Sequence, residues 1–183
     1  MLWLWIVLGI VALLVLWIIG SYNGLVRLRN RVRDQWAQID VQLKRRFDLI
    51  PNLVETVKGY TKHESETLEN VVKARNTYLS ATTPEAQMEA NGELTQAISK
   101  LFALTESYPD LKANSNFIKM QDDLKETEDK ISYARQFYND TVLKYNNKVE
   151  TIPTNIIAGL FGFKKEKFFE AQGAERENVQ VKF

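Results

Sequence analysis

Few side chains in this sequence are of the kinds that do chemistry, and their spacing argues against catalysis. His63 is the only histidine, and the His63-Glu64 pair lacks the second histidine of a zinc site of the H-E-x-x-H type. A carboxylate-bridged di-iron bundle needs two Glu-x-x-His pairs, and Tyr60 occupies the place of the glutamate before His63. The absence of cysteine excludes disulfides, thiolate ligands and thiol catalysis. We therefore expect no enzyme activity, no metal and no cofactor.

Other arrangements that bind phosphate or activate a nucleophile are also missing. Gly159-x-x-Gly162 lies in an apolar tail without the strand–turn–helix context of a phosphate loop. A serine triad would have to use the same histidine, so a hydrolase that uses His63 is the weakest hypothesis that we carry. The net charge of +1 argues against nucleic-acid binding through bulk electrostatics. We expect neither nucleic acid nor a small-molecule substrate as a partner.

The first twenty residues carry no charged side chain and are mainly leucine, isoleucine, valine and tryptophan. Twenty helical residues rise about 30 Å, the thickness of the hydrocarbon core of a bilayer. A buried core helix and a cleaved signal peptide are the alternatives, but no cationic start precedes the run and no A-x-A site follows it. We predict a retained transmembrane anchor at residues 1–22, with membrane-facing side chains Leu2, Trp3, Leu4, Trp5, Ile6, Leu13, Leu14, Leu16, Trp17, Ile18 and Ile19.

Four arginines follow the anchor at steps of two: Arg27, Arg29, Arg31 and Arg33. Because cationic residues stay on the cytoplasmic side of a membrane, they predict an outside N-terminus and a cytoplasmic body. Steps of two spread the side chains over more than one helix face, which suits a collar for anionic headgroups. A solvated helix surface is the alternative.

An amphipathic helix continues the anchor to about residue 57, and its apolar residues recur seven apart. This spacing keeps one stripe facing partner helices. Pro51 removes the hydrogen bond to the Phe47 carbonyl, which predicts a bend in the helix because the apolar pattern resumes in register. The residues predicted to form the bundle and to support assembly are Trp36, Ile39, Leu43, Phe47, Ile50, Pro51, Leu53 and Val57.

Residues typical of helix ends predict where the remaining helices begin and end. Gly59 is the expected end of the first helix, although the next periodic segment, through Leu79, could also be its extension. Thr83 and Pro84 have the types expected at the start of a third helix, and the Tyr108-Pro109-Asp110 stretch should break it before a long last helix. We predict an all-α fold in which a single transmembrane helix continues into an antiparallel, up-down four-helix bundle at residues 23–150, with long first and last helices.

The tail, residues 151–183, mixes apolar and cationic residues. In an up-down arrangement of four helices it returns to the membrane, whereas with three helices it would point away. Its composition is typical of an interfacial segment, and packing on the end of the bundle is the alternative. The expected interfacial residues are Phe161, Phe163, Lys164, Lys165, Lys167, Phe168 and Phe169. The alternating end at residues 179–183 is too short to hold as a strand by itself.

Several blocks in this sequence resemble the hallmarks of the LemA family, in the order that the family has them. They cover nearly the whole chain and comprise Arg46-Phe47-Asp48-Leu49-Ile50-Pro51-Asn52-Leu53-Val54, Gly59-Tyr60, Tyr108-Pro109-Asp110-Leu111-Lys112-Ala113-Asn114, Ala134-Arg135, Tyr138-Asn139, Tyr145-Asn146, Ala158-Gly159-Leu160-Phe161-Gly162-Phe163 and Phe168-Phe169-Glu170-Ala171.

The resemblance implies a single-pass protein of the bacterial cytoplasmic membrane, with a helical bundle in the cytoplasm and no known catalytic activity. It also implies links of some relatives to a membrane zinc metalloprotease of the heat-shock type, and of a magnetosome-associated branch to membrane vesicle formation. Our first hypothesis is a scaffold or adaptor that oligomerises through its bundle and partners such a protease in envelope quality control. The alternative is a homo-oligomer that shapes membrane lipids.

Overall fold

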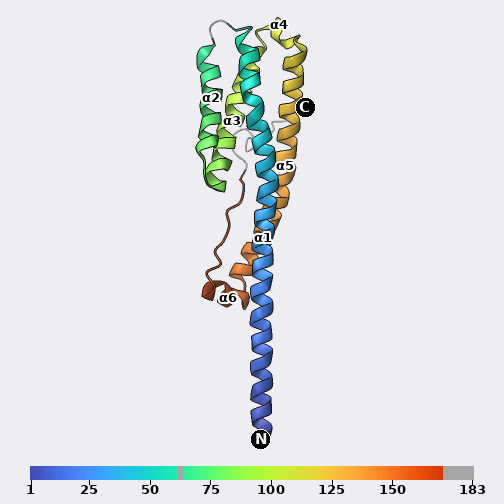
Figure 1. Ribbon diagram of the computed structural model, residues 1–183, viewed down its shortest axis with the longest axis vertical. Helices are drawn as coiled ribbons and strands as arrows, with labels where there is room; N and C mark the ends of the chain where they lie inside the picture. The colour runs from blue at the N-terminus through green and yellow to red at the C-terminus, as the bar shows by residue number, and fades with distance from the viewer. Residues whose placement is uncertain (62–63, 171–183) are drawn as a thin grey trace, which may run out of the picture. The chain divides into compact units, whose positions relative to one another are not determined.

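The computed structural model describes residues 1–61 and 64–170, and every regular element in these ranges is a helix. The prediction of an all-α chain with one long apolar N-terminal helix is confirmed. In chain order (Figure 1) the helices are α1 (Leu2–Lys58), α2 (Ser65–Ser80), α3 (Pro84–Thr105), α4 (Pro109–Lys112), α5 (Ser115–Glu150) and α6 (Thr154–Leu160).

The contacts divide the chain into two compact units. The first contains residues 1–37 and 136–168, and the second contains residues 38–135 together with residues 169 and 170. The helices α1 and α5 each contribute to both units. The expected boundaries at residues 22 and 150 do not coincide with this division, because the segment after α5 packs with the first helix.

The start of α1 has no cover from the rest of the described chain. All the predicted anchor residues are exposed, from Leu2 to Ile19. This part of α1 is long and apolar enough to cross a membrane, and none of the apolar window is buried. Because contiguous apolar surface of this size is rare in contact with water, the helix fits a single-pass membrane protein.

Most of the apolar stripe of α1 lies in the core of the second unit. Trp36 is half-buried and Pro51 is exposed, whereas all the other predicted stripe residues are at most 1% exposed: Ile39, Leu43, Phe47, Ile50, Leu53 and Val57. The stripe therefore faces helices of its own chain and is not available to a partner. Any assembly surface of the folded chain must lie elsewhere.

The helix ends follow the predicted punctuation closely. The Thr83 hydroxyl accepts a hydrogen bond from the Ala86 N–H at 3.2 Å, with Pro84 at the first helical position of α3. α1 ends at Lys58, directly before Gly59, so α1 and α2 are separate helices. The predicted break at residues 108–110 was only partly right, because proline also suits a first helical turn and begins the short α4 there.

In the second unit, Pro51 is accommodated inside α1 by a contact from α2. Proline cannot donate to the Phe47 carbonyl four residues earlier, and the Arg75 Nε of α2 donates to that oxygen instead, at 3.2 Å. The Phe47 ring stacks on the Tyr78 ring, with centroids 3.7 Å apart. The Tyr78 hydroxyl donates to Asp40 at 3.1 Å, and burial, reinforced by the Asp40 carboxylate, raises the pKa of Tyr78.

Arg46 ties α1 to α3 and α5 within the same unit. It is 3% exposed, and its Nη1 donates to the Asn91 Oδ1 at 2.7 Å and to the Thr95 hydroxyl at 3.1 Å. The same nitrogen lies 2.5 Å from a carboxylate oxygen of Glu128. A guanidinium can be buried here because carbonyl, hydroxyl and carboxylate oxygens replace its hydration.

Candidate functional site: the membrane-proximal segment

The helix α6 belongs to the first unit and carries apolar side chains on two sides. Ile157 and Ala158 are buried. Ile156 and Leu160 lie four residues apart on another face and are 59% and 75% exposed. Phe161, directly after α6, is 54% exposed. One side of this short helix therefore packs on the protein and the other presents uncovered apolar surface.

Gly162 ends α6 and sets the direction of the chain after it. Its φ of 70° lies in the left-handed region, which favours glycine. The Phe163 N–H donates to the Ala158 carbonyl at 2.9 Å, and the Gly162 N–H donates to the Gly159 carbonyl at 3.4 Å. This pair of bonds is a Schellman motif. The Gly159-x-x-Gly162 spacing therefore belongs to a helix terminus.

The turn brings two phenylalanines against the part of α1 that follows the apolar stretch. The Tyr22 ring centroid is 4.8 Å from that of Phe161 and 5.7 Å from that of Phe163. The Arg29 guanidinium lies over the Phe163 ring at 4.9 Å from its centroid. Because Tyr22 comes three residues after Ile19, these contacts place the end of α6 next to the end of the candidate span. Figure 1 shows α6 beside α1.

Side chains of α5 hold the main chain that follows Gly162. The Asn146 amide donates to the Glu166 carbonyl and accepts from the Glu166 N–H, both at 2.9 Å. The Tyr138 hydroxyl donates to the Lys167 carbonyl at 3.0 Å. The Trp36 ring of α1 packs edge-on against Tyr138, at 5.8 Å between centroids. This part of the tail is thus fixed to the protein through backbone recognition.

The arginine collar is divided between solvent and protein. Arg27, Arg31 and Arg33 are exposed, whereas Arg29 is half-buried and its guanidinium stacks on the Phe163 ring. Burial raises the pKa of the Tyr145 hydroxyl and Glu166 acts in the same direction, while Arg29 and Arg33 oppose this shift. The collar therefore also acts on the electrostatics of Tyr145 on α5, the helix that holds the tail.

The structure corrects two of the predicted interfacial residues. Phe163 and Phe169 are 7% and 3% exposed, because protein side chains already cover their rings. In the second unit the Phe169 ring lies 5.7 Å from the Arg135 guanidinium. The other predicted tail residues are exposed, namely Phe161, Lys164, Lys165, Lys167 and Phe168, and Lys165 pairs with Glu150 at 2.7 Å.

Sequence reasoning did not single out two features of this segment. The exposed pair Ile156 and Leu160 was grouped with the tail, although their spacing of four residues is a usable signal of one helix face. Asn146 was noted only as part of a family motif. The sequence around an asparagine on a long helix does not indicate which distant main-chain groups its amide will bind. The hydrogen bonds between Asn146 and Glu166 could therefore not be predicted.

No candidate catalytic group is brought together in the described residues. His63 lies outside them, so the structure does not place it. Within residues 1–61 and 64–170, no group of three or more histidine, aspartate or glutamate side chains could hold a metal ion.

Comparison with known proteins finds relatives of this chain and a family to which it belongs. Protein LemA of Metamycoplasma hominis is 27% identical over 167 residues, covering 89% of this chain and 75% of that protein. Magnetosome protein MamQ 2 of Paramagnetospirillum magneticum and Magnetosome protein MamQ of Magnetospirillum gryphiswaldense are 23% and 22% identical, over 84% of this chain and 66% of each relative. The model of the LemA family matches residues 35–183, well over half of the sequence, and the chain therefore belongs to the LemA family.

Proposed function

We propose that this chain is a non-catalytic scaffold or adaptor, held at a membrane by α1 and by the apolar face of α6. The observation that carries the proposal is the contact of Tyr22 with Phe161, which sets an exposed apolar face beside an uncovered apolar helix. Two adjacent apolar surfaces with cationic neighbours are what an anchored, interfacial segment requires. The cationic neighbours are Arg27, Arg31, Arg33, Lys164, Lys165 and Lys167.

We infer that the membrane is the bacterial cytoplasmic membrane, with the N-terminus outside and the chain after the anchor in the cytoplasm. Support comes from the arginines that follow the span. A membrane-impermeant maleimide should label an Asp122→Cys variant only after the cells are permeabilised. Labelling in intact cells would place Asp122 outside the cytoplasm and would contradict this topology.

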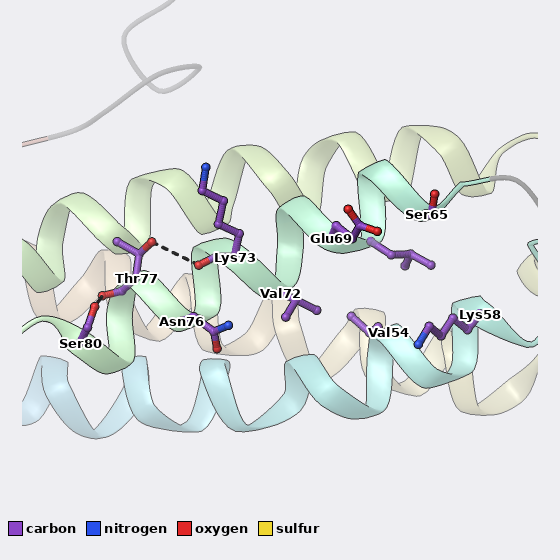
Figure 2. A pocket seen from close by; sticks show the side chains of 10 residues that line it. Val54, Lys58, Ser65, Glu69, Val72, Lys73, Asn76, Thr77 and Ser80 are labelled. Atoms are coloured by element: carbon purple, nitrogen blue, oxygen red, sulfur yellow. Dashed lines mark hydrogen bonds between the residues drawn. The ribbon is translucent and has the colours of Figure 1, made fainter.

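The second unit presents a groove that suits a partner segment. Figure 2 shows the groove between the end of α1 and one face of α2, with a volume of about 570 Å³. Val54, Leu68 and Val72 supply apolar surface, while Lys58 and Lys73 stand at its edges. We infer that the helices around it form the up-down four-helix bundle, supported by the hydrogen bonds that join α1 to α2 and α3. A bundle with an open apolar groove can receive an amphipathic helix.

We propose that the partner is a membrane zinc metalloprotease of the heat-shock type, acting in envelope quality control, and that copies of this chain assemble around it. Membership of the LemA family supports this choice. The buried stripe of α1 is closed to a partner, so the groove is the surface assigned to binding.

A photo-crosslinking amino acid at Asn76, in the groove, tests this assignment in native membranes. We expect adducts with the protease or with a second copy of this chain, identified by mass spectrometry. The matched control places the same amino acid at Asp122 on α5, outside the groove. Equal adducts at both positions, or none at Asn76, would contradict the adaptor role.

Membrane shaping is the second candidate, and the presence of two membrane contacts on one chain favours it. Purified protein should then deform liposomes, and the combined change Ile156→Ser, Leu160→Ser and Phe161→Ser should abolish the deformation. The buried Phe163 and Phe169 are left unchanged, because serine there would damage the fold. Leu79→Ser, on the exposed side of α2, is the control. Unchanged deformation in the triple variant would remove the physical basis of this candidate.

A further inference from the structure

The course of the chain at its last described residues is set by the second unit. Phe169 is seated at 3% exposure against Arg135. Glu170 then lines a small pocket together with Gly92 and Thr95 of α3. The chain therefore leaves Glu170 at the surface between α3 and α5, with thirteen residues still to follow.

A larger groove of about 390 Å³ continues from this point along the same two helices. Thr95 and Glu128 line both the small pocket and the groove, so the two lie next to each other. The groove has an apolar floor, formed in part by Ile98 and Leu124, which are 4% and 3% exposed. Its walls carry hydroxyl, amide and amine groups from Ser99, Gln121 and Lys125.

We propose that the C-terminal segment, residues 171–183, docks in this groove of its own chain. The proposal does not depend on the proposed function. The groove lies beside the last described residues. A segment that is already attached at Glu170 loses much less translational and rotational freedom on binding than a separate partner would lose.

The first unit shows the chemistry by which this chain holds extended segments. Asn146 and Tyr138 bind the main chain of Glu166 and Lys167 through an amide and a hydroxyl. The walls of the groove offer the same kinds of groups. Extended backbone needs such partners, because it cannot satisfy its own N–H and C=O groups.

The spacing fixes which residues should meet. One turn of α3 from Thr95 to Ser99 rises about 6 Å, which two extended residues cover at about 3.3 Å each. Gln172 should therefore lie beside Ser99 if Glu170 lies beside Thr95. The neighbouring Ala171, Gly173 and Ala174 are small enough to lie on the floor.

Disulfide trapping tests this register directly, because the chain has no native cysteine. The variant Ser99→Cys with Gln172→Cys should form an intrachain disulfide under mild oxidation, seen as a monomer whose mobility changes on reduction. The control Lys100→Cys with Gln172→Cys uses an exposed position on another face of α3 and should stay reduced. Equal oxidation in both pairs, or only interchain disulfides, would overturn the proposal.

A second measurement covers the case in which the disulfide geometry is unfavourable. In the full chain with Ser99→Cys alone, maleimide labelling should become several-fold faster when Ala171→Trp and Ala174→Trp are added, because the bulky rings cannot lie in the groove. The same additions should leave labelling of Lys100→Cys unchanged. If both labelling rates are unaffected, the segment does not occupy the groove.

Discussion

Two neighbouring arginines of α1 have different environments and should contribute differently to stability. Arg46 is buried with partners on α3 and α5, whereas Arg45 pairs with Glu126 at 3.8 Å with about half of each side chain exposed. Removing one partner of a buried polar cluster leaves the others unsatisfied, so Arg46→Met should cost about 3 kcal/mol. Arg45→Met should cost less than about 1 kcal/mol. Denaturant unfolding in detergent measures both, and equal losses would contradict the assigned role of Arg46.

The hydrogen bond between Tyr78 and Asp40 predicts a dependence of stability on alkaline pH. Burial raises the pKa of Tyr78 above its unfolded value, so the native state keeps a proton that the unfolded chain loses. The resulting stabilisation is fully present below about pH 10 and is lost as the pH rises above it.

Comparison with a phenylalanine variant isolates this contribution. Between about pH 9 and 11, the free energy of unfolding should fall more steeply for the wild-type chain than for Tyr78→Phe. The Phe ring keeps the stack on Phe47 but has no proton to lose. Parallel slopes for the two proteins would show that the phenol does not titrate differently on unfolding.

At the scale of single residues, the sequence predicts interactions between side chains and groups that lie close to them along the chain. Thr83 was identified as a helix cap because its partner is three residues away. The partners of Arg46 are 45 or more residues distant, so only the packed helices reveal them. The hydrogen bond that Pro51 removes was foreseen, whereas its replacement by Arg75 was not.

Among the elements, the end of α6 offers a matched pair of glycines. Gly162→Ala should cost about 1 kcal/mol or more, because alanine is strained in the left-handed region. Gly159→Ala, inside α6, should instead stabilise the helix by about 0.5–1 kcal/mol. A Cβ at either position meets nothing within 4 Å, so backbone conformation alone separates the two.

Hydrogen exchange of the Phe163 amide gives the most local measurement of this pair. Its protection should fall in Gly162→Ala, because the bond to the Ala158 carbonyl depends on the turn, and should hold in Gly159→Ala. Reduced protection in both variants would mean that the Schellman motif does not control the position of Phe163.

The long helices were predictable from the sequence and the short ones were not. α1 and α5 contain many periodic apolar residues, which outweigh a single proline. α4 and α6 have four and seven residues, too few for a helical period to be recognised. Their proline and glycine residues are visible in the sequence, but the pattern predicts a helix break at residues 108–110 and an interfacial segment in the tail.

For the molecule as a whole, the sequence predicted an anchor, a body and a tail that returns to the anchor. Contacts in the first unit bring the tail to Tyr22, near the end of the candidate span. What the sequence could not separate was the tail's protein-facing rings from its exposed ones, because Phe161 and Phe163 have the same chemistry. The turn at Gly162 decides which of the two is covered.

Quenching by brominated lipids is the most direct test of the claim that α6 forms a second membrane contact beside α1. A fluorophore is attached to single cysteines in liposome-reconstituted protein, at Leu160→Cys, with Leu16→Cys in the anchor and Asp122→Cys on α5 as the two references. The account predicts strong quenching at positions 16 and 160 and none at 122. Quenching at 16 with none at 160 would contradict it.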